Sequence, residues 1–238
     1  MKKLLLPFFG IAILLSSCSK GGDSSQPTES GNGNVTTTQT VSIGGTSYPT
    51  VKIGTQTWTS VNYNGSGGAN YTSANDPVYG KLYTVAESKA ITLPAGWRLP
   101  TKADFETLVK NYAYKVDVDG FYNILPDGTK KLKSTTGWTI MNGDNTSGFS
   151  ALAAGIGVIP TTSLGQFQDK GLDAWFISST DLPPNNNTGV ISTDTWCMTI
   201  ACESYKSGTQ TLTDDSGEVM YLYRSGDYRY SIRFVKDN

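Results

Sequence analysis

The sequence predicts a single α+β domain. A well-capped amphipathic helix over residues 101–112 is the first observation that supports this class. The second is the alternation of apolar and polar residues over 48–63 and 228–234, which is typical of half-buried strands. Beyond residue 115, short strand segments and turns dominate. One or two helices followed by a run of strands favour an α+β fold over a parallel sheet.

The start of the chain predicts a lipoprotein signal peptide over residues 1–17. Two lysines precede an apolar run over residues 4–15, which is too short to span a bilayer and has the length of a secretory signal. The run ends in LSSC, which resembles a bacterial lipobox. The resemblance implies cleavage before Cys18 and acylation of this residue, which would anchor the protein in a membrane. An ordinary signal peptide that contains a cysteine is the alternative.

Residues 18–40 are predicted to form an acylated cysteine followed by a flexible tether. This segment is dominated by Ser, Thr, Gly and Asn, which bury too little apolar surface to fold. Its root-mean-square span should be about 25 Å. Ser19, Lys20 and Asp23 loosely resemble the export signals of Bacteroidetes-type lipoproteins, so we expect the outer membrane with the folded domain facing the cell exterior. That domain is predicted to occupy residues 41–238.

The first elements of this domain are strands and a short helix. Residues 48–63 predict two short strands that separate at Gly54 and Thr55. Residues 79–90 then predict a short helix. Its apolar side would carry Leu82, Val85 and Ala86.

The next helix has a clear start signal. Thr101 follows Pro100 and is a good N-cap, and Asp104 at the third helical position completes a capping-box variant. The predicted apolar face consists of Phe105, Leu108, Val109 and Tyr112. The predicted solvent face consists of Lys102, Glu106 and Lys110.

The end of the chain predicts a hairpin around residues 225–227. In its second arm, one face should be apolar and buried, with Tyr228, Tyr230, Ile232 and Phe234. The other face would carry Arg229, Ser231 and Arg233.

Composition excludes several functions. The 19 basic and 20 acidic residues give a net charge of −1 without like-charged blocks, so neither nucleic acid nor an anionic membrane surface is an expected partner. The chain contains no histidine. A Ser-His-Asp or Cys-His catalytic system and a typical catalytic zinc site are therefore excluded, whereas chemistry based on carboxylates stays open.

Cys197 and Cys202 could form a disulfide if Cys18 is acylated, because exported proteins retain such bonds. In one continuous strand these residues would lie roughly 16 Å apart. A disulfide needs Cα atoms within about 7 Å, so the chain would have to turn near Ile200 and Ala201.

Two acidic clusters could supply oxygen ligands to calcium. They comprise residues Asp117 and Asp119, and residues Asp214, Asp215 and Glu218. Neither cluster has EF-hand spacing, so solvated loop acids are the simpler interpretation and no cofactor is expected.

Aromatic and amide residues supply the candidate ligand-binding positions. Four tryptophans are expected in the core, namely Trp58, Trp97, Trp175 and Trp196. Exposed aromatics beside Arg or Asn can stack on sugars or hold peptides. The candidates for that role are Trp138, Tyr228, Arg229, Asn185, Asn186 and Asn187. A satisfied sheet face would explain the same residues.

Several segments in this order resemble the Fibrobacter succinogenes major paralogous domain family. The motifs are VKIGTQTWTSVNYN, YGKLYTVAES, PAGWRLPTKADFETLV, KLKSTTGW, GFSALAAGIGV, FISSTD and YSIRFVKD, which together span about residues 48–238. The resemblance implies a C-type-lectin-like or formylglycine-generating-enzyme-like fold, with two helices on twisted antiparallel sheets and long loops. It implies no common activity. The family usually shows His, Trp and Cys where this chain has Arg98, Phe105 and Phe234.

Three functional hypotheses follow. The favoured one is a noncatalytic binding or adhesion module on the outer membrane, which contacts a glycan, the matrix or another surface protein. The second is a structural or assembly component of the cell envelope. The third is an enzyme that uses carboxylates or a metal with oxygen ligands, which the missing histidine makes less favourable.

Overall fold

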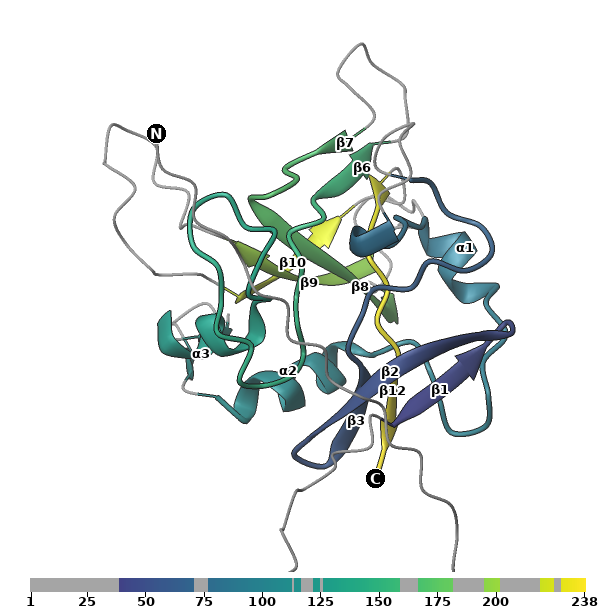
Figure 1. Ribbon diagram of the computed structural model, residues 1–238, viewed down its shortest axis with the longest axis horizontal. Coiled ribbons are helices and arrows are strands. Elements are labelled where there is room, and N and C mark those ends of the chain that lie inside the picture. Colours follow the sequence, from purple (N-terminus) through teal and green to yellow (C-terminus); the bar gives the residue numbers. More distant parts are fainter. Residues whose placement is uncertain are drawn as a thin grey trace, which may run out of the picture. The chain divides into compact units, whose positions relative to one another are not determined.

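The computed structural model describes the folded part of the chain (Figure 1). The described residues are 39–70, 77–112, 114–116, 122–124, 126–158, 167–181, 195–201, 219–224 and 228–238. They all belong to one unit, Thr37–Asn238. Among them, no helix combines the length and apolarity that crossing a bilayer requires.

The first sheet joins the beginning and the end of the domain. Its strands are β1 (Thr40–Ile43), β2 (Thr46–Ile53), β3 (Gln56–Thr59) and β12 (Val235–Asp237), in the order β1-β2-β3-β12 with antiparallel neighbours. The predicted break at Gly54 and Thr55 is confirmed, because β2 and β3 form a hairpin around these residues. Trp58 pairs with Val51 on one side and with Val235 on the other.

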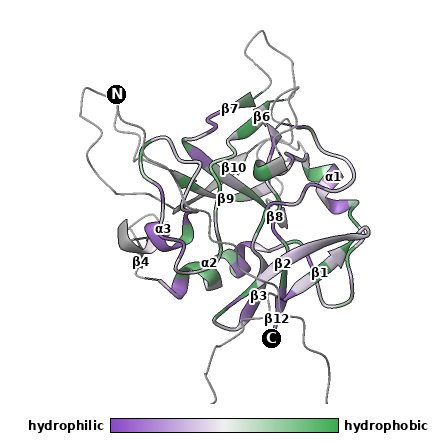
Figure 2. Cartoon of the chain, in the orientation of Figure 1, coloured by the Kyte–Doolittle hydropathy of each residue, from purple (hydrophilic) through white to green (hydrophobic). Residues whose placement is uncertain are grey.

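The predicted long helix is confirmed as α2 (Lys102–Lys110). The Thr101 hydroxyl accepts a hydrogen bond from the Asp104 backbone, and the Asp104 carboxylate accepts one from the Thr101 backbone, which completes the capping box. Phe105, Leu108 and Val109 are buried, as expected. Tyr112 lies just beyond the helix and packs against the same core. The alternation of hydrophobic and hydrophilic residues along α2 is visible in Figure 2.

Two other helical predictions need correction. The short helix α1 (Val85–Lys89) begins only after its N-cap Thr84, so Leu82 is not helical and pairs with Ala69 in a β-bridge instead. A third helix, α3 (Pro126–Leu132), occupies a region expected to consist of strands and loops. Pro126 suits the first helical position, and complete burial of Leu132 offsets the low propensity of the internal glycine. A 3₁₀ turn, η1 (Pro77–Tyr79), precedes α1.

The remaining strands form three small sheets. The central sheet has the order β10-β9-β8, from β10 (Val219–Arg224), β9 (Thr195–Ala201) and β8 (Asp173–Asp181). A second has the order β11-β6-β7, from β11 (Tyr228–Arg229), β6 (Ile156–Val158) and β7 (Phe167–Gln168). The strands β4 (Tyr114–Val116) and β5 (Tyr122–Ile124) form a pair.

The predicted terminal hairpin is wrong. Strand β10 pairs with β9, whereas β11 pairs with β6, so the two arms belong to different sheets. From β11 the chain continues past β8, through a bridge between Ser231 and Phe176, and ends in the first sheet as β12 (Figure 1, yellow). The C-terminal segment thus connects three sheets instead of closing a local hairpin.

The central sheet separates two hydrophobic cores. Ala174 and Phe176 of β8 contribute to one core, which also contains the buried face of α2. Trp175 and Ile177 contribute to the other, which contains a cluster of tyrosines. Because β8 is covered on both faces, it lacks the alternation that a half-buried strand would show. The expected core positions of Trp58 and Trp175 are confirmed, whereas Trp97 is only partly buried and packs against the core. The side chain of Trp196 lies outside the described part.

Candidate functional site

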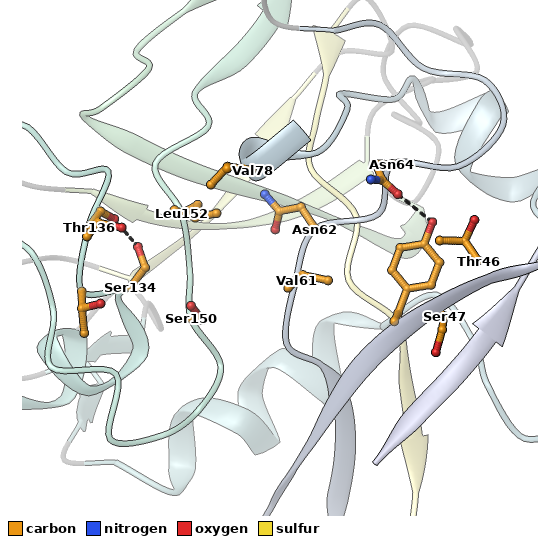
Figure 3. Close-up of a pocket in the computed structure, with 12 residues that line it drawn as sticks. Thr46, Ser47, Val61, Asn62, Asn64, Val78, Ser134, Thr136, Ser150 and Leu152 are labelled. Atoms are coloured by element: carbon orange, nitrogen blue, oxygen red, sulfur yellow. Dashed lines mark hydrogen bonds between the residues drawn. The ribbon is translucent and has the colours of Figure 1, made fainter. Parts of the chain in front are cut away.

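A pocket of about 400 Å³ opens between segments that are far apart in the sequence (Figure 3). Its size lies within the range typical of small-molecule sites. The described lining residues share one property, which is that none of them carries a charge at neutral pH. They are Thr46, Ser47, Tyr48, Val61, Asn62, Asn64, Val78, Ser134, Thr135, Thr136, Ser150 and Leu152.

Four stretches of the chain supply this lining. Strand β2 provides residues 46–48, and the segment after β3 provides Val61, Asn62 and Asn64. The turn η1 adds Val78. The connection between α3 and β6 adds residues 134–136 and 150–152 on the other side, as Figure 3 shows.

Tyr48 and Asn64 form a hydrogen-bonded pair at one end of the pocket. The Tyr48 hydroxyl donates to Asn64 Oδ1 at 2.9 Å. Burial raises the pKa of the Tyr48 hydroxyl above its ordinary value. The hydroxyl therefore stays protonated and keeps donating at neutral pH. The amide nitrogen of Asn64 points away from Tyr48 (Figure 3), which leaves its two N–H groups for another acceptor.

A buried guanidinium holds two walls of the pocket in place. Arg233 is 0% exposed and donates through Nε to Asn62 Oδ1 at 2.7 Å. Its Nη2 donates to the Ser150 carbonyl at 2.8 Å. Its Nη1 donates to the carbonyls of Thr59 at 2.9 Å and Phe149 at 2.7 Å. Arg233 thus ties the segment after β3 to the segment before β6.

The environment of Arg233 corrects the expectation of a half-buried polar face. The rings of Phe149 and Phe176 cover the guanidinium, with centroids 4.8 and 5.5 Å from its central carbon. Burial lowers the pKa of Arg233 to about 9, which still leaves the group charged at pH 7. Ser231 on the same face is also buried. Residues 230–234 are therefore buried on both faces. The polar side chains of Ser231 and Arg233 form hydrogen bonds with other parts of the domain.

Backbone geometry also marks the pocket wall. Ser150 has a φ of 54°, and so does Asn145, whose side chain accepts from the Ser150 N–H at 2.8 Å. Residues other than glycine enter this left-handed region at a cost of about 1 kcal/mol or more, and such positions cluster at ligand sites. The bonds from Arg233 and Asn145 hold Ser150 in this conformation.

The pocket retains unused hydrogen-bonding capacity. Within the described part of the chain, the hydroxyl groups of Thr135, Thr136 and Ser150 and the amide nitrogen of Asn64 make no hydrogen bond. Asn62 differs, because its amide donates to the Tyr79 carbonyl and to the Ser231 hydroxyl while accepting from Arg233. The site therefore combines fixed walls with several available polar groups.

Comparison with known proteins identifies the family. The model of the Fibrobacter succinogenes major domain family matches residues 51–236, which is more than half of the chain. The chain belongs to this family. No curated protein and no solved structure matches it. The pocket lies almost wholly within the matched region, with only residues 46–48 before it.

Arg98 has a structural role in this family member. Its Nη2 donates to Asp104 Oδ1 at 2.7 Å and to Asp237 at 3.0 Å. Gln56 donates to the same Asp104 oxygen at 2.9 Å and accepts from the Trp58 indole. This network joins the start of α2 to β3 and β12, and it does not reach the pocket.

Trp138 is not an exposed binding aromatic, in contrast to the prediction. It is only 6% exposed, and its indole N–H donates to the Ser134 hydroxyl at 3.2 Å and the Ala151 carbonyl at 3.0 Å. Ser134 in turn donates to the Thr136 carbonyl at 2.6 Å. Trp138 therefore supports the pocket wall from inside the core.

Tyr228 and Arg229 do not line this pocket. Both are half-buried, and Arg229 pairs with Glu87 at 2.6 Å. Glu87 lines a second pocket of about 400 Å³. Burial alone would raise the pKa of Glu87, but hydrogen bonds from Thr84 and the Arg229 guanidinium hold it below its usual value. Tyr228 packs against the tyrosine-containing core.

Several predicted residues lie outside the described part. They are Cys18, Asn185, Asn186, Asn187, Cys202 and both acidic clusters. Cys197 is buried in β9, which continues to Ala201, so the turn that a disulfide with Cys202 requires does not occur before that residue. Among the described residues, no group of three or more His, Cys, Asp or Glu is placed to hold a metal ion.

Sequence patterns did not reveal the pocket or Arg233. Serine, threonine and asparagine in loops are common, and no spacing links residues 46–48 with 134–136. The one available signal was an arginine in the segment YSIRFV, between apolar residues on both sides.

Proposed function

We propose that this protein is a noncatalytic binding module, displayed on the cell surface by a lipid anchor, which accepts a ligand in the neutral polar pocket. The pocket carries the proposal, because it combines fixed walls with polar groups that make no hydrogen bond to the described residues. The chain has no histidine, and the described lining residues include no carboxylate or amine, which supports binding over catalysis. A C-type-lectin-like arrangement is part of the proposal, and the joining of the domain's two ends through β3 and β12 is compatible with it.

The anchor follows from the lipobox-like sequence that ends at Cys18. Acyl chains on this residue would hold the domain at the outer membrane, with residues 19–40 as a spacer that lets it reach partners outside the cell. Two or more chains give stable attachment.

Replacing Cys18 by serine should release the protein from the membrane fraction. The intact mass of the wild-type protein should include fatty acyl groups, and that of Cys18→Ser should not. Accessibility of the wild-type domain to an added protease on whole cells would establish the exterior face. A wild-type product that is soluble and carries an unmodified thiol would contradict the anchor.

Binding is tested with the full acylated chain in a detergent without a sugar headgroup, on a glycan array and in pull-downs from cell-surface extracts. Thr135→Trp should block the pocket, because Thr135 is exposed at its lining. Thr55→Trp introduces the same side chain at an exposed turn residue outside the lining and should bind like the wild type. At least a tenfold loss of captured partner is expected for Thr135→Trp alone.

Two outcomes would count against a binding module. Equal capture by both variants would place any binding elsewhere on the molecule. No capture by any form, together with a defined oligomer in light scattering, would favour a structural component of the envelope.

A further inference from the structure

From the chemistry of the lining we infer that the pocket binds an uncharged saccharide unit and does so without a metal ion. This inference rests on the proposed function and narrows it to one class of ligand. Three properties of the pocket lead to it, which are its charge, its hydrogen-bonding groups and its apolar surface.

Among the residues that the structure describes, the lining offers no counter-charge to an ion. All twelve of its residues are neutral, and Tyr48, the one with a titratable phenol, has a raised pKa. The charged group of Arg233 is buried behind the pocket wall. It donates hydrogen bonds to Asn62 and to three backbone carbonyls, and two phenylalanine rings cover it. An ionic ligand would lose hydration without gaining a partner, which is costly. A neutral ligand avoids this cost.

The available groups match hydroxyl-rich molecules. The hydroxyls of Thr135, Thr136 and Ser150 can each donate and accept, and the amide of Asn64 can donate twice. A sugar ring presents several hydroxyls that also do both. Because polar groups that stay unpaired in a complex reduce affinity, a ligand without such hydroxyls would be a poor fit.

The apolar part of the lining is aliphatic and small. Val61 and Val78 are 36% and 62% exposed, and Leu152 lies beside Val78 in Figure 3. They can contact the C–H face of one sugar ring. Tyr48 is only 3% exposed, so the described lining residues provide no stacking surface for a nucleobase or an aromatic peptide side chain. The same side chains contain no carboxylate to hold a calcium ion against the sugar.

The test measures binding of glucose, galactose, mannose and N-acetylglucosamine to the full chain in lipid nanodiscs, by saturation-transfer NMR and calorimetry. Glucuronic acid and glucosamine are the charged counterparts, and every titration is repeated with EDTA. At least one neutral sugar should bind at least tenfold more tightly than its charged counterpart, with no change in EDTA.

Two matched substitutions locate the effect. Asn64→Asp keeps the shape and the acceptor for Tyr48 but removes the donor and adds a charge, so binding of the neutral sugar should fall at least tenfold. Thr136→Val should weaken it several-fold, whereas Thr55→Val, the same change outside the lining, should not. Each variant is compared with the wild type by thermal unfolding, so that a folding defect is recognised.

The outcomes separate this inference from the proposed function. Preference for a charged sugar, or loss of binding in EDTA, would overturn the inference. If no sugar binds but the pull-down still finds a partner that Thr135→Trp loses, the saccharide class is wrong and the binding pocket stands. If Thr135→Trp changes nothing in either assay, both are wrong.

Discussion

Replacing Arg233 by methionine should lower the free energy of unfolding by about 3–5 kcal/mol. Methionine has a similar length, but it leaves Asn62 Oδ1 and the carbonyls of Thr59, Phe149 and Ser150 without the donor they now share. Each unsatisfied buried acceptor costs about 1–3 kcal/mol. Denaturant unfolding, monitored by tryptophan fluorescence, measures the change.

Two control variants test whether the loss of stability is specific to the buried donors of Arg233. Arg233→Lys keeps the charge but not the planar fork of donors, so its loss should be smaller than that of Arg233→Met yet clearly measurable. Arg229→Met removes a half-buried arginine from a more exposed pair and should cost about 1 kcal/mol or less. If Arg233→Met and Arg229→Met were equally stable, Arg233 would not organise the domain as described.

Asp104→Ala should destabilise the protein by about 2–4 kcal/mol. This carboxylate caps α2 through two bonds from Thr101 and accepts from Arg98 and Gln56 at its other oxygen. Loss of the cap costs about 0.5–2 kcal/mol, and the unpaired Gln56 amide adds to it. Thermal and denaturant unfolding both report the loss.

Asp237→Ala is the matched control, because Asp237 pairs with the same nitrogen of Arg98. The Asp237 side chain is 73% exposed, against 8% for Asp104. Its removal should therefore cost about 1 kcal/mol or less. Similar losses for both variants would mean that burial does not distinguish the two pairs.

The capping box shows what sequence can predict well. Thr101 and Asp104 are three residues apart, so the bonds that start α2 form within one turn and do not depend on the remaining fold. The β2–β3 hairpin is local in the same sense. The sequence motifs also predicted which family the chain belongs to, and the match of the family model to residues 51–236 confirms that prediction.

The terminal hairpin shows where local patterns fail. Turn-forming residues at 225–227 suggested that the flanking strands pair with each other. The partners of β10 and β11 come instead from β9 and β6, which end at least 18 residues earlier in the chain in both cases. Strand pairing depends on which surfaces need covering, and a turn signal does not contain that information.

The pocket could not be predicted for a related reason. Its lining residues are of common types with no recognisable spacing in the sequence. They form a pocket only because Arg233 binds both Asn62 and Ser150 and so holds distant segments together. Of the candidates proposed for exposed binding positions, Trp138 is buried and Arg229 is paired with Glu87, whereas Asn185, Asn186 and Asn187 lie outside the described residues. Alternation along a strand predicts two faces but does not say whether the polar face meets water or another part of the protein.

The most direct measurement is the amide chemical-shift map of the labelled full chain, in nanodiscs, titrated with the neutral sugar that binds most tightly. Binding in the proposed pocket predicts that the largest changes occur at Asn64, Thr136 and Ser150, and that they disappear in Thr135→Trp. Changes concentrated around Glu87 at the second pocket, or unchanged shifts at the first pocket in a saturated complex, would contradict the central claim.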